Sequence, residues 1–370
     1  MEKAKISTHQ LFVLIVLFEL GSAILVPLAV EAKQNAWLAI LIGLSGGLCL
    51  FLIYYALFSY YPDIPLTEYL QKILGSFVGK ILAFFYILYF IYISARVLRD
   101  FGELLITVFF PESPLFIMNA LMIIVVVYTI RKGIEVLART GELIFIIIAL
   151  LGISGFILIS ISGSMHISNL QPVLEEGLRP VLKTAFTTLY FPFGEIIVFT
   201  MIFPFLNKPE KVMKTGLYGL GLSGVILALI MTINISVLGV SLLSRTQFPL
   251  LSTIQTIELA GVLERLDVTF MLSSVFAGFF KLGVFFYASV EGTTNLFQIK
   301  ESSVLVYPMG FIVLLLSILI ASNFSEHVYK GLEVAPLYIH LPFQLVIPLF
   351  LLLIAFIKNR KGKDEGMKVN

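Results

Sequence analysis

Long apolar runs follow one another along the chain, and each is bounded by charged residues, proline or glycine. A helix that crosses a membrane needs about 20 mostly apolar residues. The pattern therefore predicts an all-α membrane protein, a single unit over residues 1–370 with ten transmembrane helices. We expect these helices at about residues 8–31, 36–58, 77–108, 114–130, 134–161, 184–206, 214–242, 268–296, 303–321 and 340–357.

Lysine and arginine are unevenly shared between the loops that these spans would create. An even number of spans places both termini on one side, and fifteen basic residues fall on that side against six on the other. Cytoplasmic loops carry an excess of basic residues. The charge pattern therefore predicts cytoplasmic termini, with residues 358–370 as a cytoplasmic tail.

Composition excludes several other classes of protein. Hydrophobic residues make up 59% of the chain and charged residues 13%, about half the charged fraction of soluble domains. One soluble core could not hide that much apolar surface, and a disordered chain would be richer in charge. A net charge of +2, with the basic residues in loops, argues against a nucleic-acid binder. The sequence shows no phosphate-binding loop, no metal-ligand spacing and no credible catalytic triad, so we expect neither an enzyme nor a metal or cofactor site.

The first span contains groups that an apolar helix should lack. Glu19 is followed by Gly21 and Ser22, and then by Pro27, near the middle of the run. A carboxylate is costly in lipid unless it faces protein or water, and glycine and proline weaken a helix. The pattern predicts a break in this helix close to the middle of the membrane.

The sixth span is interrupted in the same way. Pro192 lacks an amide hydrogen, Gly194 lowers helix propensity, and Glu195 adds a second mid-membrane carboxylate. Gly21 and Gly194 are 173 positions apart in a chain of 370, so the two breaks open two halves of similar length.

Paired discontinuous helices are typical of transporters built from inverted repeats. We therefore expect a five-plus-five repeat, with one half at about 8–161 and the other at about 184–357. Free amides at a break attract a carboxylate, while free carbonyls accept hydrogen bonds from an ammonium. A zwitterionic amino acid matches both sets of groups. The alternative is that these residues only permit kinks and close helix packing.

Two basic residues also fall inside predicted spans. Arg96 is one helical turn from Asp100, and these side chains either line a polar cavity or outer gate, or neutralise each other near the membrane surface. Lys281 lies among phenylalanines in the eighth span and needs a partner or water. It could bind a proton or replace a coupling sodium ion, or it could form a structural pair with Glu19 or Glu195.

Three features together resemble a known family. They are the broken first helix with the sequence GSAILVP at 21–27, the sixth helix with YFPFGE at 190–195, and ten spans in about 370 residues with a short basic tail. The chain resembles the B subunit of the germinant receptors of spore-forming bacteria, the endospore germination permease family. That family belongs to the amino acid–polyamine–organocation (APC) transporter superfamily, with its LeuT-like five-plus-five fold.

The resemblance implies a function beyond transport. A B subunit sits in the spore inner membrane with an A subunit and a C subunit, recognises a small nutrient such as an amino acid, and triggers germination. The residues alone support a small-ligand cavity in a transporter scaffold. A free-standing amino-acid permease coupled to protons or sodium therefore stays open as the alternative.

The resemblance also suggests which residues contact the ligand. The unwound stretch Gly21, Ser22 and Ala23 corresponds to the cradle for the ligand carboxylate. The second stretch, with Phe191, Pro192 and Gly194, would face the ligand ammonium and side chain.

Two tyrosines complete the expected site. Tyr92 in the third span and Tyr287 in the eighth are expected as cavity walls, although no motif fixes their alignment. Glu19 departs from a simple apolar lining, and it would neutralise Lys281 or steer the charge of the ligand.

Overall fold

The computed structural model describes residues 5–256 and 266–367, and the regular elements in these ranges are helices. The α-helices are α1 (Thr8–Leu20), α2 (Ala36–Tyr60), α3 (Leu66–Leu74), α4 (Ser76–Leu104), α5 (Leu115–Arg131), α6 (Ile134–Ile161), α7 (Leu178–Tyr190), α8 (Val212–Leu243), α9 (Pro249–Gln255), α10 (Leu266–Phe297), α11 (Ser303–Leu319), α12 (Phe324–Tyr329) and α13 (Ile347–Met367). The 3₁₀ helices are η1 (Ser22–Ile24), η2 (Val30–Asn35), η4 (Ile167–Leu170), η5 (Phe193–Met201), η6 (Phe203–Phe205) and η7 (Pro209–Lys211). The π-helices are η3 (Leu105–Phe109), η8 (Lys330–Val334) and η9 (Pro336–Val346).

These helices account for the ten predicted spans. In the described residues, seven helices are long and apolar enough to cross a membrane, and an eighth span arises from Ser303–Leu319 with Phe324–Val334, which are bent by 108°. Two shorter apolar helices, Thr8–Ile24 and Leu115–Arg131, fill the first and fourth predicted spans. The main differences lie at the C-terminal end, where the tenth span begins as η9 and continues as α13 to Met367.

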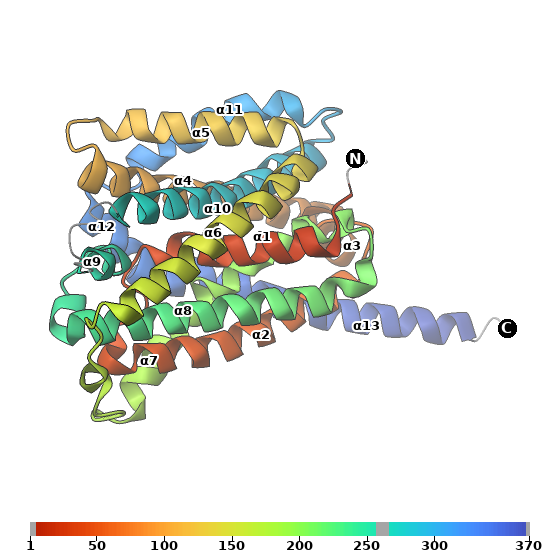
Figure 1. The fold of residues 1–370 in the computed structure, drawn as a ribbon. Helices are drawn as coiled ribbons and strands as arrows, with labels where there is room; N and C mark the ends of the chain where they lie inside the picture. The colour runs from red at the N-terminus through yellow and green to blue at the C-terminus, as the bar shows by residue number, and fades with distance from the viewer. Residues whose placement is uncertain (1–4, 257–265, 368–370) are drawn as a thin grey trace.

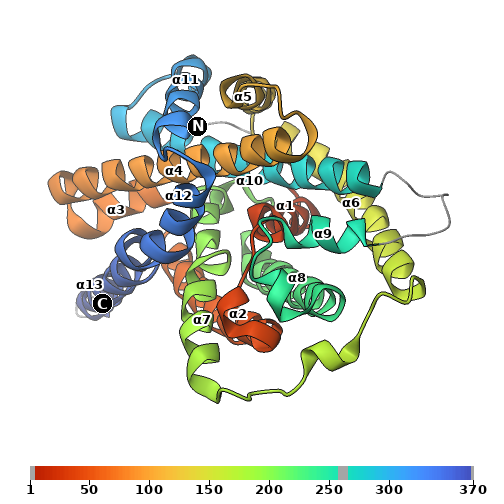
Figure 2. The same ribbon diagram turned by 90° about the vertical axis from the view of Figure 1, so that its left-hand side faces the viewer.

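The long helices run side by side, with both termini at the same end of the molecule (Figure 1). Seen from the opposite end, α1 lies near the centre, enclosed by other helices (Figure 2). It packs against α6, α8 and α10, while α4 packs against both α10 and α11. The first broken span therefore lies in the interior of the bundle.

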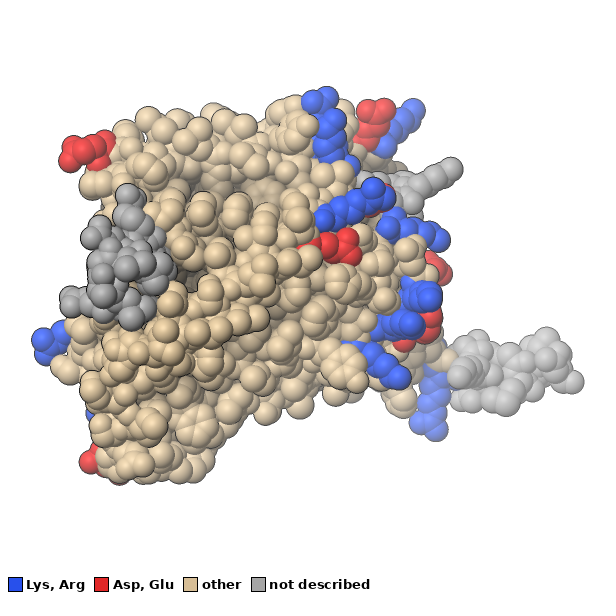
Figure 3. Space-filling view, in the orientation of Figure 1, with Lys and Arg blue, Asp and Glu red and all other residues tan. Residues whose placement is uncertain are grey.

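The surface fits a membrane environment. On the face in Figure 3, charged side chains gather toward the two ends of the molecule and leave a broad uncharged band between them. Helix α6 is the extreme case, with Leu143, Leu150 and Ile161 each more than 60% exposed. Large exposed apolar patches mark contact with a membrane or a protein, and so many apolar spans identify an integral membrane protein.

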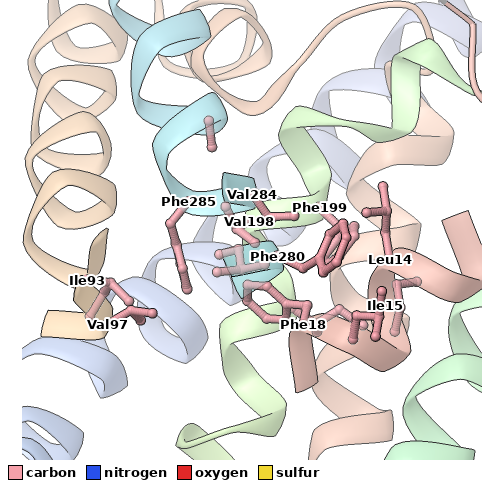
Figure 4. Close-up of a cluster of buried hydrophobic side chains, with 14 of the residues drawn as sticks. Leu14, Ile15, Phe18, Ile93, Val97, Val198, Phe199, Phe280, Val284 and Phe285 are labelled. Carbon is pink, nitrogen blue, oxygen red and sulfur yellow. The ribbon is translucent and has the colours of Figure 1, made fainter. Parts of the chain in front are cut away.

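The centre of the core lies where the two interrupted spans meet (Figure 4). The ring of Phe18 on α1 lies 5.2 Å from that of Phe199 in η5 and 5.1 Å from that of Phe285 on α10. Edge-on and tilted aromatic contacts at this separation stabilise a core beyond the area that they bury. This packing fixes the broken segments against α10.

Both predicted interruptions are present. Helix α1 ends at Leu20, and Gly21 adopts φ −13° and ψ −111°, outside the helical region, before the short η1. Helix α7 ends at Tyr190, and Phe191 is extended, with φ −126° and ψ 117°. The chain then continues as the nine-residue 3₁₀ helix η5 rather than as an α-helix.

Candidate functional site

The first break lies directly against Lys281 on α10. A Cβ atom added to Gly21 would lie 2.7 Å from the Cδ and 2.8 Å from the Cβ of Lys281, so no larger residue fits without displacement. The Lys281 ammonium lies 5.1 Å from the ring centre of Phe18 and 4.8 Å from that of Phe191. These distances are within reach of cation–π attraction. The lysine thus links the first break to the second.

The partner of Lys281 is Glu195. Its Oε2 lies 2.6 Å from the lysine Nζ, and both side chains are buried. Glu195 is therefore the residue that neutralises Lys281, one of the two carboxylates considered from the sequence. Glu19 is fully buried nearby, and neither of its carboxylate oxygens has a hydrogen-bond partner in the described part of the chain.

A small polar cavity lies beside this pair, with a volume of about 30 Å³. It brings together Ser22, Phe191, Glu195 and Arg96, all of them expected site residues, from three different spans. Its full lining is Ser22, Val26, Ile93, Arg96, Val97, Asp100, Phe191, Glu195, Val328, Gly331, Leu332 and His340. A volume of this size accommodates about one water-sized group.

A larger vestibule of about 380 Å³ lies next to the cavity. Phe191, Val328 and Leu332 line both spaces and form the partition between them. The vestibule is lined further by threonines of α7 and by Arg245 and Glu333. The cavity is thus separated from the vestibule by three apolar side chains.

The charges of α4 reach across to the bent segment after α11. Asp100 Oδ1 lies 2.6 Å from His327 Nε2, and Arg96 Nη2 donates to the His327 carbonyl at 2.9 Å. Arg96 and Asp100 therefore bind the same residue rather than each other. Arg99 and Glu103, one helical turn apart on α4, form an ion pair at 2.9 Å.

The tenth span contributes a network that sequence reasoning missed. Gln344 Nε2 donates to the Tyr89 hydroxyl at 2.8 Å, and this hydroxyl lies 3.0 Å from Nδ1 of His340. Gly194 at the second break leaves space for the Gln344 side chain, since a Cβ atom on residue 194 would overlap the Oε1 of Gln344. The available signal was a histidine and a glutamine four positions apart in an apolar run, between Pro336 and Val346.

Other expected site residues lie around the cavity rather than in its lining. Ala23 is buried in η1, and Pro192 is buried at the second break, after a cis peptide bond. Tyr92 is half-buried, with its ring centre 6.0 Å from the guanidinium carbon of Arg96.

Tyr287 lies at the other end of the bundle. It lines a polar pocket of about 810 Å³ together with Lys72, Arg131 and Lys300, and its ring packs against Phe205. Among the described residues, no group of three or more His, Cys, Asp or Glu side chains could hold a metal ion.

Solved structures show the fold. MhsT in complex with L-phenylalanine superimposes with a TM-score of 0.69 at 12% identity, over 96% of this chain and 99% of that one. Mhp1, a nucleobase-cation-symport-1 family transporter in a closed conformation, gives 0.65 at 12% identity, over 89% of this chain and 75% of that one. The predicted LeuT-like transporter fold, with discontinuous first and sixth helices, is confirmed.

Sequence relatives show the family. Spore germination protein KB of Bacillus subtilis (strain 168) is 52% identical over 368 residues, which is 99% of each chain. Spore germination protein YndE of the same strain is 26% identical over 81% of this chain and 83% of its own length. Spore germination protein GerQB of Bacillus cereus is 23% identical over 84% and 86%. A family model for spore germination proteins matches residues 5–325. The chain therefore belongs to the spore germination permease family, as its resemblance to germinant-receptor B subunits predicted.

Proposed function

We propose that this protein is the membrane subunit of a germinant receptor that binds a small nutrient, an amino acid, and triggers germination without catalysing a reaction. One observation carries the proposal: two helix breaks meet at a buried polar cavity, which three apolar side chains separate from an outer vestibule. Such an arrangement suits ligand capture followed by a change of conformation.

The ligand would lie between the two breaks. Its carboxylate would face the backbone amides of residues 21–23, because a helix end with free amides favours negative charge. Its ammonium would face the free carbonyls of the second break, near Phe191 and Gly194, with Glu195 as the nearest carboxylate. A cavity of about 30 Å³ is too small for an amino acid. Binding therefore requires the partition formed by Phe191, Val328 and Leu332 to move.

The assembly and its location belong to the same proposal. We place the protein in the spore inner membrane with a receptor A subunit and a receptor C subunit, as its resemblance to B subunits implies. Both termini lie at one end of the bundle (Figure 1), and the excess of basic residues in the loops at that end supports placing it in the cytoplasm or spore core. The two repeats would cover about residues 8–161 and 184–357.

Replacing Gly21 by leucine tests the proposed site. The added side chain must displace Lys281 or the backbone carbonyl of Phe18, so we expect spores that carry the variant at normal level to lose their amino-acid response. The matched control is Gly152→Leu on α6, because a Cβ there meets no atom within 4 Å. A normal response from Gly21→Leu spores with wild-type protein level would refute the site.

The alternative function is a free-standing amino-acid permease. Buried Lys281 favours it, because as an ammonium paired with Glu195 it could take the place of a coupling sodium ion, and as a neutral amine it could bind a coupling proton. The permease predicts concentrative uptake by the purified chain in liposomes. The receptor subunit predicts little uptake and co-purification of two further subunits from sporulating cells.

A further inference from the structure

The hydrogen bonds of the tenth span define the tautomer of His340. Gln344 Nε2 lies 2.8 Å from the Tyr89 hydroxyl and 3.2 Å from His340 Nδ1. An amide nitrogen can only donate, so Nδ1, which lies against it, accepts, and the Tyr89 hydroxyl therefore donates its proton to Nδ1 at 3.0 Å. With the Gln344 amide in this orientation Nδ1 is the acceptor, so a neutral His340 carries its proton on Nε2.

This ring belongs to the wall of the cavity. His340 is 2% exposed and lines the cavity together with residues of the two breaks. Its Nδ1 is fully engaged with Tyr89 and Gln344, so the N–H at Nε2 is the group that it can offer to a ligand. Neither of the two residues that hold the ring lines the cavity. Tyr89 and Gln344 therefore position the His340 ring, whose Nε2 is the hydrogen-bond donor.

Two further donors in the same wall lack partners. The Oγ of Ser22 and the Nη1 of Arg96 are buried without a hydrogen-bond partner among the described residues. The acidic groups of the wall each have one oxygen paired, Asp100 with His327 and Glu195 with Lys281. Buried donors without partners are costly, so this part of the wall favours a hydrogen-bond acceptor.

We propose that His340 is a ligand-binding residue, which donates from Nε2 to an oxygen atom of the nutrient, together with Ser22 and Arg96. This deepens the function proposed above, on which it rests, because it assigns the ligand a chemistry. The nutrient carries an oxygen acceptor, such as a carbonyl, carboxylate or hydroxyl oxygen, in addition to the groups held at the two helix breaks. An amino acid with a purely apolar side chain leaves the three donors unfilled.

The test uses the purified full-length chain and measures the ligand-induced rise in its unfolding temperature, which reports affinity by mass action. The probes are the twenty L-amino acids, with threonine against valine and glutamine against methionine as pairs that differ in side-chain oxygen. We expect the wild type to prefer the oxygen-bearing member. His340→Phe should lower affinity for that member by about fivefold or more, the effect of one lost hydrogen bond, and leave its apolar partner unchanged.

Two other variants separate recognition from folding. His340→Gln keeps an N–H donor and should retain the preference for the oxygen-bearing amino acid. His340→Met has no donor, and it is measured in place of His340→Phe if the phenylalanine variant does not accumulate. A wild-type preference for apolar side chains, or an equal loss for both members of a pair, overturns the inference but leaves the proposed function standing. A wild type that none of the probes stabilises overturns both.

Discussion

Lys281 Nζ lies 2.6 Å from Glu195 Oε2, so one buried ion pair ties α10 to the second helix break. The same lysine side chain fills the space beside Gly21 at the first break. A single residue thus fixes the relative position of both unwound segments. Movement of either segment must therefore change the surroundings of this pair.

Removing one member of the pair should be far more harmful than removing both. Lys281→Met leaves the Glu195 carboxylate buried without its partner, and we expect a loss of stability of about 3–5 kcal/mol. Adding Glu195→Gln should recover most of that loss, since neither of the two positions then carries a charge that lacks its partner. The measurement is the unfolding temperature of the purified variants.

An exposed lysine provides the comparison. Lys183 pairs with Glu31 at 3.8 Å, and its side chain is 77% exposed. Lys183→Met should change stability by less than about 1 kcal/mol. Equal losses for the single and the double variants at 281 and 195 would argue against a net contribution from pairing.

Gly194 should tolerate no side chain. A Cβ there would overlap the Oε1 of Gln344 and push it away from Tyr89. We expect Gly194→Ala to cost about 1–3 kcal/mol, the usual effect of overfilling a packed interior, measured by thermal unfolding. Gly155→Ala is the control, because its Cβ meets no atom within 4 Å. It should leave stability unchanged or raise it by up to about 1 kcal/mol. Similar effects at both glycines would contradict the close approach of Gln344.

Arg99 should be needed as an arginine. Its Nη1 donates to the carbonyls of Ser317, Ile318 and Ala321, at 3.2, 3.0 and 2.7 Å, where α11 ends and the chain bends. Lysine keeps the charge but lacks the planar fork. Arg99→Lys should therefore cost about 1–3 kcal/mol in thermal unfolding, as buried carbonyls lose their donors.

Arg139 serves as the reference for that substitution. It pairs with Glu135 on the surface of α6, and its side chain is 69% exposed. Arg139→Lys should cost less than about 1 kcal/mol. If lysine at 99 were as harmless as lysine at 139, Arg99 would not be the cap that holds the end of α11.

The fold and the two breaks could be predicted from the sequence because their signals are local. A carboxylate, glycine or proline in the middle of an apolar run is unfavourable wherever the helix packs. His340 and Gln344 could not be identified in the same way, because their importance depends on which side of the tenth span faces α4. The third span shows the same limit: Tyr89 bonds to His340, whereas Tyr92 is half-buried. Only packing distinguishes these two tyrosines.

The partition above the cavity should control access to Ser22. Leu332 lines both the vestibule and the cavity. Ser22 is 1% exposed and lines the cavity but not the vestibule. With Cys49, which is exposed, replaced by serine, Ser22→Cys should react slowly with a membrane-impermeant maleimide. Adding Leu332→Ala should raise the rate by roughly tenfold, which corresponds to about 1.4 kcal/mol less resistance to opening.

The control for this experiment lies on the following π-helix. Leu337 is 49% exposed and lines neither space, so Leu337→Ala should not change the labelling rate. Because the vestibule lies on the side away from the termini, the acceleration should occur only when the reagent is added on that side. Fast labelling of Ser22→Cys with Leu332 intact would mean that the three apolar side chains do not close the cavity, and the ligand would then need no movement of the partition to enter.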